Sequence, residues 1–168
     1  MGRPLLSIII ITKDEQDNIK DCLESVKWAD EIIVVDSGSV DKTEEICRKY
    51  TDNLYAKDWP GFGIQKQRAL DLASHEWVLS IDADERVTPD LKDEIISVLS
   101  SNFNINGYLI PRLSNYFGKD IRHTGWYPDY TLRLVKRQKS YFTKDIVHEK
   151  MVVDGSITKL SNHFLHYP

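Results

Sequence analysis

The chain has 168 residues, of which 41% are hydrophobic and 29% charged, and its formal net charge is −4. This length suits one compact domain, and the composition excludes a disordered or membrane-spanning protein. A negative net charge without a basic block argues against nucleic-acid binding. The apolar start is too short to cross a bilayer and lacks a signal-peptide cleavage site, so we expect a cytoplasmic protein that can still bind a membrane surface.

The first hundred residues alternate predicted strands with predicted helices. Continuous β-branched runs predict buried strands, and apolar side chains at helical spacing follow them. This alternation is typical of an α/β domain with a mostly parallel central sheet flanked by helices. The predicted strands cover 5–11, 31–36, 53–58 and 77–82, and the predicted helices are a segment through Val26, one carrying Ile46, 64–73 and 88–100.

Two of these helices have recognisable starts. Thr12 and Glu15 have the spacing of a capping box, in which each side chain bonds the backbone of the other. Thr88 is followed by Pro89, a pair typical of an N-cap and a first helical residue. We therefore expect one helix to begin at Thr12 and another at Thr88.

The pattern changes beyond Ser100, where short β-like pieces lie between polar and aromatic loops. Residues 107–113 and 130–136 predict strands. Residues 151–160 predict a hairpin with Asp154 and Gly155 in the turn. We expect this C-terminal third to be less regular than the rest, and no linker-like stretch separates it as a second domain.

Carboxylates follow three of the predicted parallel strands: Glu15 after the first, Asp36 at the end of the second, and Asp82 and Asp84 after the fourth. Ligands of α/β sheets bind beyond the carboxyl ends of the strands. Clustered carboxylates stay charged at neutral pH beside a cation, and oxygen ligands suit Mg²⁺ or Mn²⁺ shared with a nucleotide diphosphate. The competing interpretation is a turn or a helix cap, and it is the favoured one for Asp36 taken alone.

Glu85 is interpreted differently from its acidic neighbours. Alternation of side chains directs it away from Asp84, and Arg86 beside it offers a partner, so we expect a structural salt bridge between Glu85 and Arg86. Cys22 and Cys47 lack metal-ligand spacing and are expected to be reduced thiols.

Three segments carry a resemblance to a known family. SIIIITKDEQDNI, IIVVDSGSVDKT and WVLSIDADERV, in this order and spacing, resemble the inverting family 2 glycosyltransferases of the GT-A fold. DWPGFGIQKQRAL, GWYPDYTLRL and VHEKM extend the resemblance, which is greatest to the branch of the lipopolysaccharide inner-core β-1,4-glucosyltransferase. It implies one Rossmann-like domain over 1–168, in which 1–100 bind a nucleotide sugar and 101–168 bind the acceptor.

The activity that the resemblance implies is transfer of a sugar from a UDP-sugar to a saccharide or lipid-linked saccharide of the cell envelope. In the nearest branch the sugar is glucose and the acceptor is the lipopolysaccharide core. Relatives of this branch usually continue into a helical C-terminal part, so we expect either a truncated catalytic domain or a short member.

The resemblance also assigns roles to residues. Asp82-Ala83-Asp84 corresponds to the D-x-D motif, with both aspartates as candidate metal ligands. Asp84 is the more direct ligand, Asp82 lies nearer the ribose or sugar, and His148 is a further candidate ligand. His163 and His166 have no acidic partner in the sequence and are expected to bind no metal. The implied nucleotide-sugar-binding residues are Thr12, Glu15, Asp36, Gln65, Lys66, Arg68 and Asp82.

Inverting transfer needs a base that takes the proton of the acceptor hydroxyl. Asp129 matches the position of this base in the family, with Glu149 as the alternative, and a Pro-Asp turn is the competing interpretation of Asp129. Aromatic faces pack well on sugar rings. The implied acceptor-binding residues are Trp126, Tyr127 and Tyr130.

Two other classes of protein also carry carboxylates at the ends of parallel strands. A sugar nucleotidyltransferase has a Gly-rich basic loop after its first strand, and TKDEQDN has no glycine there. A receiver-like signalling module holds Mg²⁺ without turnover, but it keeps the β-α alternation to its end. Aromatic loops and β-like pieces in the last third favour the transferase.

Overall fold

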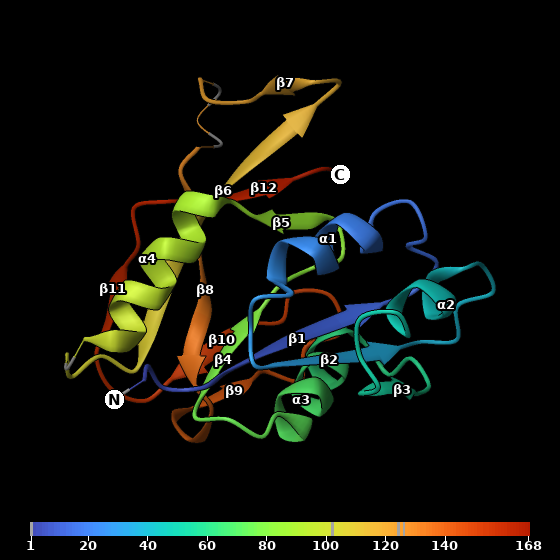
Figure 1. The fold of residues 1–168 in the computed structure, drawn as a ribbon, viewed down its shortest axis with the longest axis horizontal. Helices are drawn as coiled ribbons and strands as arrows, with labels where there is room; N and C mark the ends of the chain where they lie inside the picture. Colours follow the sequence, from blue (N-terminus) through green and yellow to red (C-terminus); the bar gives the residue numbers. More distant parts are fainter. Residues whose placement is uncertain (1, 102, 124, 126) are drawn as a thin grey trace.

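Buried β-branched strands form the centre of the sheet, as the apolar runs predict. β1 (Leu6–Thr12) runs parallel to β2 (Glu31–Asp36) on one side and to β4 (Trp77–Ser80) on the other. Helices cover both faces of these strands, which explains why their sequences show no polar alternation. β3 (Leu54–Ala56) extends the parallel part beyond β2. This computed structural model (Figure 1) describes residues 2–101, 103–123, 125 and 127–168.

Strands in mixed orientation extend the sheet beyond β4. β8 (Asp129–Lys136) pairs antiparallel with β4 and with β6 (Gly107–Tyr116). β12 (Phe164–His166) joins β6, to which it runs parallel, to β5 (Glu85–Val87), to which it runs antiparallel. The order across the sheet is β3-β2-β1-β4-β8-β6-β12-β5. The last third of the chain therefore supplies strands to the same sheet, and long loops connect them.

Short strands pair at the edges. β7 (Lys119–Asp120) and β11 (Ile157–Lys159) pair with β6, while β9 (Ser140–Phe142), reached through a 3-10 turn at Arg137–Lys139, pairs with β10 (Met151–Val153).

The predicted hairpin over 151–160 is wrong, because its two halves pair with different strands. Asn106 explains the separation: its backbone N–H donates to Ser156 O at 2.8 Å, and its side chain donates to Asp154 O at 2.9 Å. These bonds to a distant residue replace the bonds that a hairpin would make across the Asp154-Gly155 turn.

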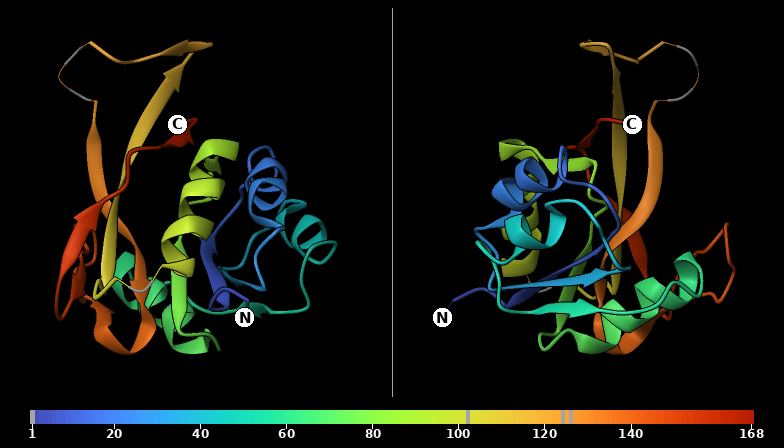
Figure 2. Two further views of the ribbon diagram at one scale, coloured as in Figure 1. Left: turned by 60° about the vertical axis from the view of Figure 1, so that its left-hand side comes forward. Right: turned by 90° about the vertical axis from the view of Figure 1, so that its right-hand side faces the viewer.

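Helices cover both faces of the sheet (Figure 2). α1 (Ile19–Val26), α2 (Thr43–Cys47) and α4 (Pro89–Ser100) lie on one face, and α3 (Phe62–Leu72) lies on the other. The buried apolar side chains form two clusters accordingly, one under α1, α2 and α4 and one under α3.

One predicted helix start is confirmed. The Thr88 hydroxyl accepts a hydrogen bond from Leu91 N at 3.2 Å, and Pro89 occupies the first helical position. α4 thus begins where the sequence indicates.

The other predicted start is wrong. α1 begins at Ile19, and Thr12 is still part of β1. The backbone N–H of Glu15 donates to Thr43 Oγ1 at 2.8 Å, so a bond from α2 replaces the capping box. The hydroxyl of Thr12 is left without a hydrogen-bond partner in the part of the chain that the structure describes.

Cys22 and Cys47 are free and buried, as expected for reduced thiols. Burial raises the pKa of Cys47 to about 12, which makes its thiol unreactive at neutral pH. In the described part of the chain, no helix combines the length and the hydropathy that a membrane span requires.

Gly63, in the first turn of α3, tests how tightly this helix meets the segment before β10. A Cβ at this position would lie 2.0 Å from the carbonyl oxygen of Thr143 and 2.9 Å from that of Asp145. Gly63→Ala should therefore lower the free energy of unfolding by about 1–3 kcal/mol, although Ala normally stabilises a helix by about 1 kcal/mol relative to Gly. Urea denaturation measures the change. Gly2→Ala, where a Cβ meets nothing within 4 Å, is the control, and a more stable Gly63→Ala protein would contradict the contact.

Candidate functional site

Three of the strand-end carboxylates, Glu15, Asp82 and Asp84, line one cavity of about 560 Å³ at the carboxyl ends of β1 and β4. Thr12 lines it with a buried hydroxyl that has no hydrogen-bond partner among the described residues. Buried polar atoms are normally paired, so this hydroxyl is available to a ligand. The polar lining residues are Thr12, Lys13, Glu15, Lys66, Asp82, Asp84, Arg112, Glu149 and His166.

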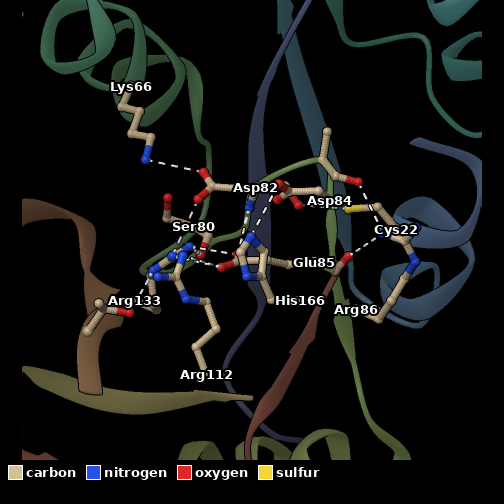
Figure 3. A network of polar contacts seen from close by, with 12 residues as sticks. Cys22, Lys66, Ser80, Asp82, Asp84, Glu85, Arg86, Arg112, Arg133 and His166 are labelled. Atoms are coloured by element: carbon tan, nitrogen blue, oxygen red, sulfur yellow. Dashed lines mark hydrogen bonds and ion pairs between the residues drawn. The ribbon is translucent and has the colours of Figure 1, made fainter. Parts of the chain in front are cut away.

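Asp84 and His166 face each other in this cavity (Figure 3). His166 Nε2 lies 3.3 Å from Asp84 Oδ2, and its Nδ1 lies 2.9 Å from the Ser114 hydroxyl. The expectation that His166 has no acidic partner is wrong, because β12 pairs with β5 and brings His166 beside the loop after β4. A carboxylate oxygen and an imidazole nitrogen form a donor set that fits a divalent cation.

No complete metal cage is preformed in the described residues, since no three His, Cys, Asp or Glu side chains group for one. Mg²⁺ commonly completes its coordination with water and substrate phosphates, so Asp84 and His166 would supply only part of the shell. Burial and the charges of Asp84 and Asp41 raise the pKa of Glu15, so a cation is favoured at this end of the cavity. His148, the predicted additional ligand, is exposed and lies outside the lining.

Asp82 lies between two cationic side chains. Lys66 Nζ is 3.2 Å from Asp82 Oδ1 and 2.8 Å from Glu149 Oε1, and Arg133 Nη2 is 3.4 Å from Asp82 Oδ2. Burial alone would raise the pKa of Asp82, but Arg133 and Lys66 outweigh it and hold that pKa well below its usual range. Asp82 therefore stays ionised and can accept hydrogen bonds from a ligand.

Glu85 anchors the loop that carries both aspartates. Its carboxylate is fully buried and receives two bonds of 2.9 Å from the guanidinium of Arg133. It also accepts the backbone N–H of Asp82 at 2.9 Å. The predicted salt bridge between Glu85 and Arg86 is therefore wrong, because the guanidinium that pairs with Glu85 is that of Arg133. Arg86 instead donates to Ala83 O at 3.1 Å, within the same loop.

A β-bulge directs Arg133 toward Glu85. In the β6–β8 ladder, Leu132 pairs with Leu109 and Leu134 with Tyr108, so Arg133 is the unmatched residue. A bulge re-aims side chains and is frequent beside functional sites. The isolated sequence carries no sign of this bulge, which explains why the partner of Glu85 was not predicted.

Three of the predicted donor-binding residues lie outside the cavity. Asp36 accepts two backbone N–H bonds from the turn that follows it, which is the competing interpretation. Gln65 is buried and donates to Ser37 Oγ at 2.9 Å. Arg68 pairs with Asp58 at 2.9 Å. α3 carries three of the predicted donor-binding residues, Gln65, Lys66 and Arg68, and of these only Lys66 lines the cavity.

Both candidate bases, Glu149 and Asp129, lie at or close to the cavity. Glu149 lines the cavity and bonds Lys66. Asp129 begins β8, and its Oδ2 is 2.8 Å from Nη2 of Arg112, which also lines the cavity.

The predicted acceptor-binding aromatics lie elsewhere. The Tyr127 hydroxyl is 3.4 Å from His163 Nδ1, and the Tyr130 ring lies 4.5 Å from Lys159 Nζ. Neither lines the cavity, and Trp126 lies outside the described residues. The aromatic side chains that do line it are Trp59 and Phe62, just before and at the start of α3.

This mixed sheet, with an acidic cavity at the carboxyl ends of its parallel strands, defines the GT-A fold of glycosyltransferases. Staphylococcus aureus TarS, residues 1–349, superposes with a TM-score of 0.71 at 17% identity, covering 97% of this chain and 60% of that one. Glucosyl-3-phosphoglycerate synthase from Mycobacterium tuberculosis, solved with Mn²⁺, UDP and glucosyl-3-phosphoglycerate, gives 0.64 at 17% identity, covering 97% and 72%.

The chain belongs to glycosyl transferase family 2, whose sequence model matches residues 7–155. The lipopolysaccharide core biosynthesis glycosyltransferase LpsC of Rhizobium meliloti is 32% identical over 158 residues, which are 90% of this chain and 58% of LpsC. An uncharacterized glycosyltransferase of Rickettsia bellii is 42% identical over 105 residues, 62% of this chain and 35% of that protein. The chain thus spans 58% of the length of LpsC and 35% of the length of the Rickettsia protein.

Removal of the Arg133 guanidinium should cost the protein about 3–5 kcal/mol of stability, because the buried Glu85 would lose both of its 2.9 Å bonds and be left with Arg112, whose Nη1 is 3.9 Å away. Urea denaturation of Arg133→Met tests this loss. The double variant Glu85→Leu/Arg133→Met should recover part of it. Arg48→Met is the control: Arg48 pairs with Glu44 at 3.8 Å with a side chain 63% exposed, and such pairs contribute about 1 kcal/mol or less. Equal effects of Arg133→Met and Arg48→Met would contradict the anchoring role.

Proposed function

We propose that this chain transfers a sugar from a UDP-sugar to a saccharide acceptor with inversion at the anomeric carbon. The observation that carries the proposal is the pair Asp82 and Asp84 lining a cavity at the strand ends of a family 2 domain. The TarS structure in complex with UDP-GlcNAc supports a nucleotide-sugar donor for this fold. Family membership argues against both the nucleotidyltransferase and the receiver-like module.

Residues 1–100 would hold most of the donor. The free hydroxyl of Thr12 and the carboxylate of Glu15 would bond the nucleoside, and ionised Asp82 would accept a bond from the ribose or the transferred sugar. Lys66, fixed beside Asp82, would place its positive charge next to the diphosphate. Residues 101–168 would supply the acceptor side, with His166 reaching back to the donor.

A divalent cation, Mg²⁺ or Mn²⁺, would be held by Asp84 and His166 together with diphosphate oxygens. When bound, it supplies positive charge that stabilises the departing UDP. The hydrogen bond between His166 and Ser114 fixes the ring so that Nε2 faces Asp84, which prepares the donor set in advance.

Asp129 is the proposed base and Glu149 the alternative. Either carboxylate would accept the proton of the acceptor hydroxyl as that oxygen attacks, a contribution of roughly 10²–10⁴-fold in rate. Each has a cationic neighbour that holds the carboxylate in place: Arg112 lies 2.8 Å from Asp129, and Lys66 lies 2.8 Å from Glu149.

Glucose and the lipopolysaccharide core are the proposed sugar and acceptor. The similarity to LpsC, named for lipopolysaccharide core biosynthesis, supports this acceptor, whereas glucose follows from the resemblance of the sequence to the glucosyltransferase branch. A lipid-linked acceptor would place the reaction at the cytoplasmic surface of a membrane. Hydrolysis of a panel of UDP-sugars tests the donor without an acceptor, and we expect UDP-glucose to be hydrolysed fastest. Hydrolysis of none of them, with UDP unbound, would overturn the proposal.

Asp84→Ala should abolish the metal-dependent part of UDP binding, because it removes the carboxylate that would hold the cation. His166→Ala should weaken that part less. Titration calorimetry with UDP, with and without Mn²⁺, measures both. Asp52→Asn is the matched control: Asp52 is exposed and precedes β3, at the opposite edge of the sheet. Unchanged Mn²⁺ dependence in Asp84→Ala would remove this residue from the metal site.

Asp129→Asn should leave UDP binding intact and reduce sugar transfer by at least about 10²-fold, the smaller effect typical of a lost base. Glu149→Gln should reduce transfer much less if Asp129 is the base. Transfer rates measured beside UDP affinity separate the two. The reverse order of effects would assign the base to Glu149.

A further inference from the structure

Trp59 and Phe62 form an aromatic pair at the rim of the cavity. Their ring centroids are 4.7 Å apart and their planes perpendicular, and both side chains line the cavity. Trp59 is 45% and Phe62 42% exposed, so packing in the hydrophobic core does not explain why aromatic residues stand at these positions. We propose that this pair is a platform for a pyranose ring, either the transferred sugar or the acceptor sugar; the inference rests on the proposed glycosyl transfer.

The platform is built on a segment that the rest of the chain holds in place. Phe62 N donates to Ile146 O at 3.1 Å, and Gly63 N donates to Asp145 O at 3.2 Å. Gly61, at φ +112°, allows the close approach to the Ile146 backbone. Two contacts thus fasten the start of α3 to the loop that carries Val147, another apolar residue of the cavity wall.

Arg68 fixes the other end of this segment. Its guanidinium lies 2.9 Å from the Asp58 carboxylate and 3.2 Å from the Asp58 carbonyl oxygen. Arg68 therefore acts on the residue immediately before Trp59. A binding surface that is ordered before the ligand arrives loses less entropy on binding, so these contacts favour a preformed platform.

The platform adjoins the polar groups that suit sugar hydroxyls. Phe62 and Lys66 are four residues apart in α3, so they lie on the same side of the helix. Lys66 bonds both Asp82 and Glu149. A pyranose has an apolar face that packs on aromatic rings and hydroxyls that both donate and accept. Lys66 donates and Glu149 accepts, which matches the edge of such a ring beside the platform.

The double variant Trp59→Ala/Phe62→Ala tests the platform through two sugar measurements. The first is titration calorimetry with UDP and with UDP-glucose. The second is saturation-transfer NMR with methyl β-D-glucopyranoside, which needs no nucleotide. Trp59→Phe keeps an aromatic ring and should behave as the wild type. Phe117→Ala is the matched control, because Phe117 is fully exposed and lies on the turn between β6 and β7.

We expect the double variant to lose about 3–10-fold in one sugar measurement, the size of an aromatic contact, with the melting temperature and UDP affinity unchanged. A weaker affinity for UDP-glucose assigns the platform to the transferred sugar. A loss confined to saturation transfer from the glucoside assigns it to the acceptor.

Two results would overturn the inference: both sugar measurements unchanged in the double variant, or UDP itself weakened as much as UDP-glucose, which would show that the rings hold the nucleoside. A wild-type protein that binds no UDP counts against the proposed function. The glucoside measurement still decides the platform in that case, because saturation transfer absent from the wild type would overturn it.

Discussion

The buried ion pair between Glu85 and Arg133 connects two strands that are not neighbours in the sheet, β5 and β8, beside the candidate site. Glu85 begins β5, Arg133 lies in β8, and both contact the loop that carries Asp82. Removing two charges from water is costly, and the cost is recovered only when each finds its partner in good geometry. Correct pairing of the late strands is therefore a condition for an ordered loop at Asp82 and Asp84, and the fold and the candidate site depend on the same interaction.

Local patterns predicted those features that depend on neighbouring residues. The apolar runs gave the parallel strands, and Thr88 gave the start of α4, because burial on both faces and helix capping leave short-range signals. The failed predictions involve bonds between distant residues. Thr43 takes the N–H of Glu15, and Asn106 takes the place of cross-strand bonds in the expected hairpin. A single sequence contains no pattern that indicates which distant residue will take these hydrogen bonds.

The same distinction divides the candidate site. Strand-end positions correctly brought Asp82, Asp84 and Glu15 to one cavity, since the carboxyl ends of parallel strands share an edge. Arg133 and His166 were missed because a bulge and the pairing of β12 with β5 bring them in. In α3, successive residues point about 100° apart, so Lys66 reaches the cavity while its neighbour Gln65 is buried against a loop. The family motif marks the helix but not its orientation.

The bulge in β8 is an irregularity of the ladder on which the pairing of Arg133 with Glu85 depends. Leu132 packs with the cluster under α3 and Leu134 with the cluster under α1, α2 and α4, although residues two apart in a regular strand share one face. Deleting one residue here would give a more regular ladder and would turn the guanidinium away, so Glu85 would lose its two short bonds to Arg133. Natural variation in the length of β8 should therefore be tolerated at its ends and selected against beside Arg133, because a more regular strand there would make the protein less stable.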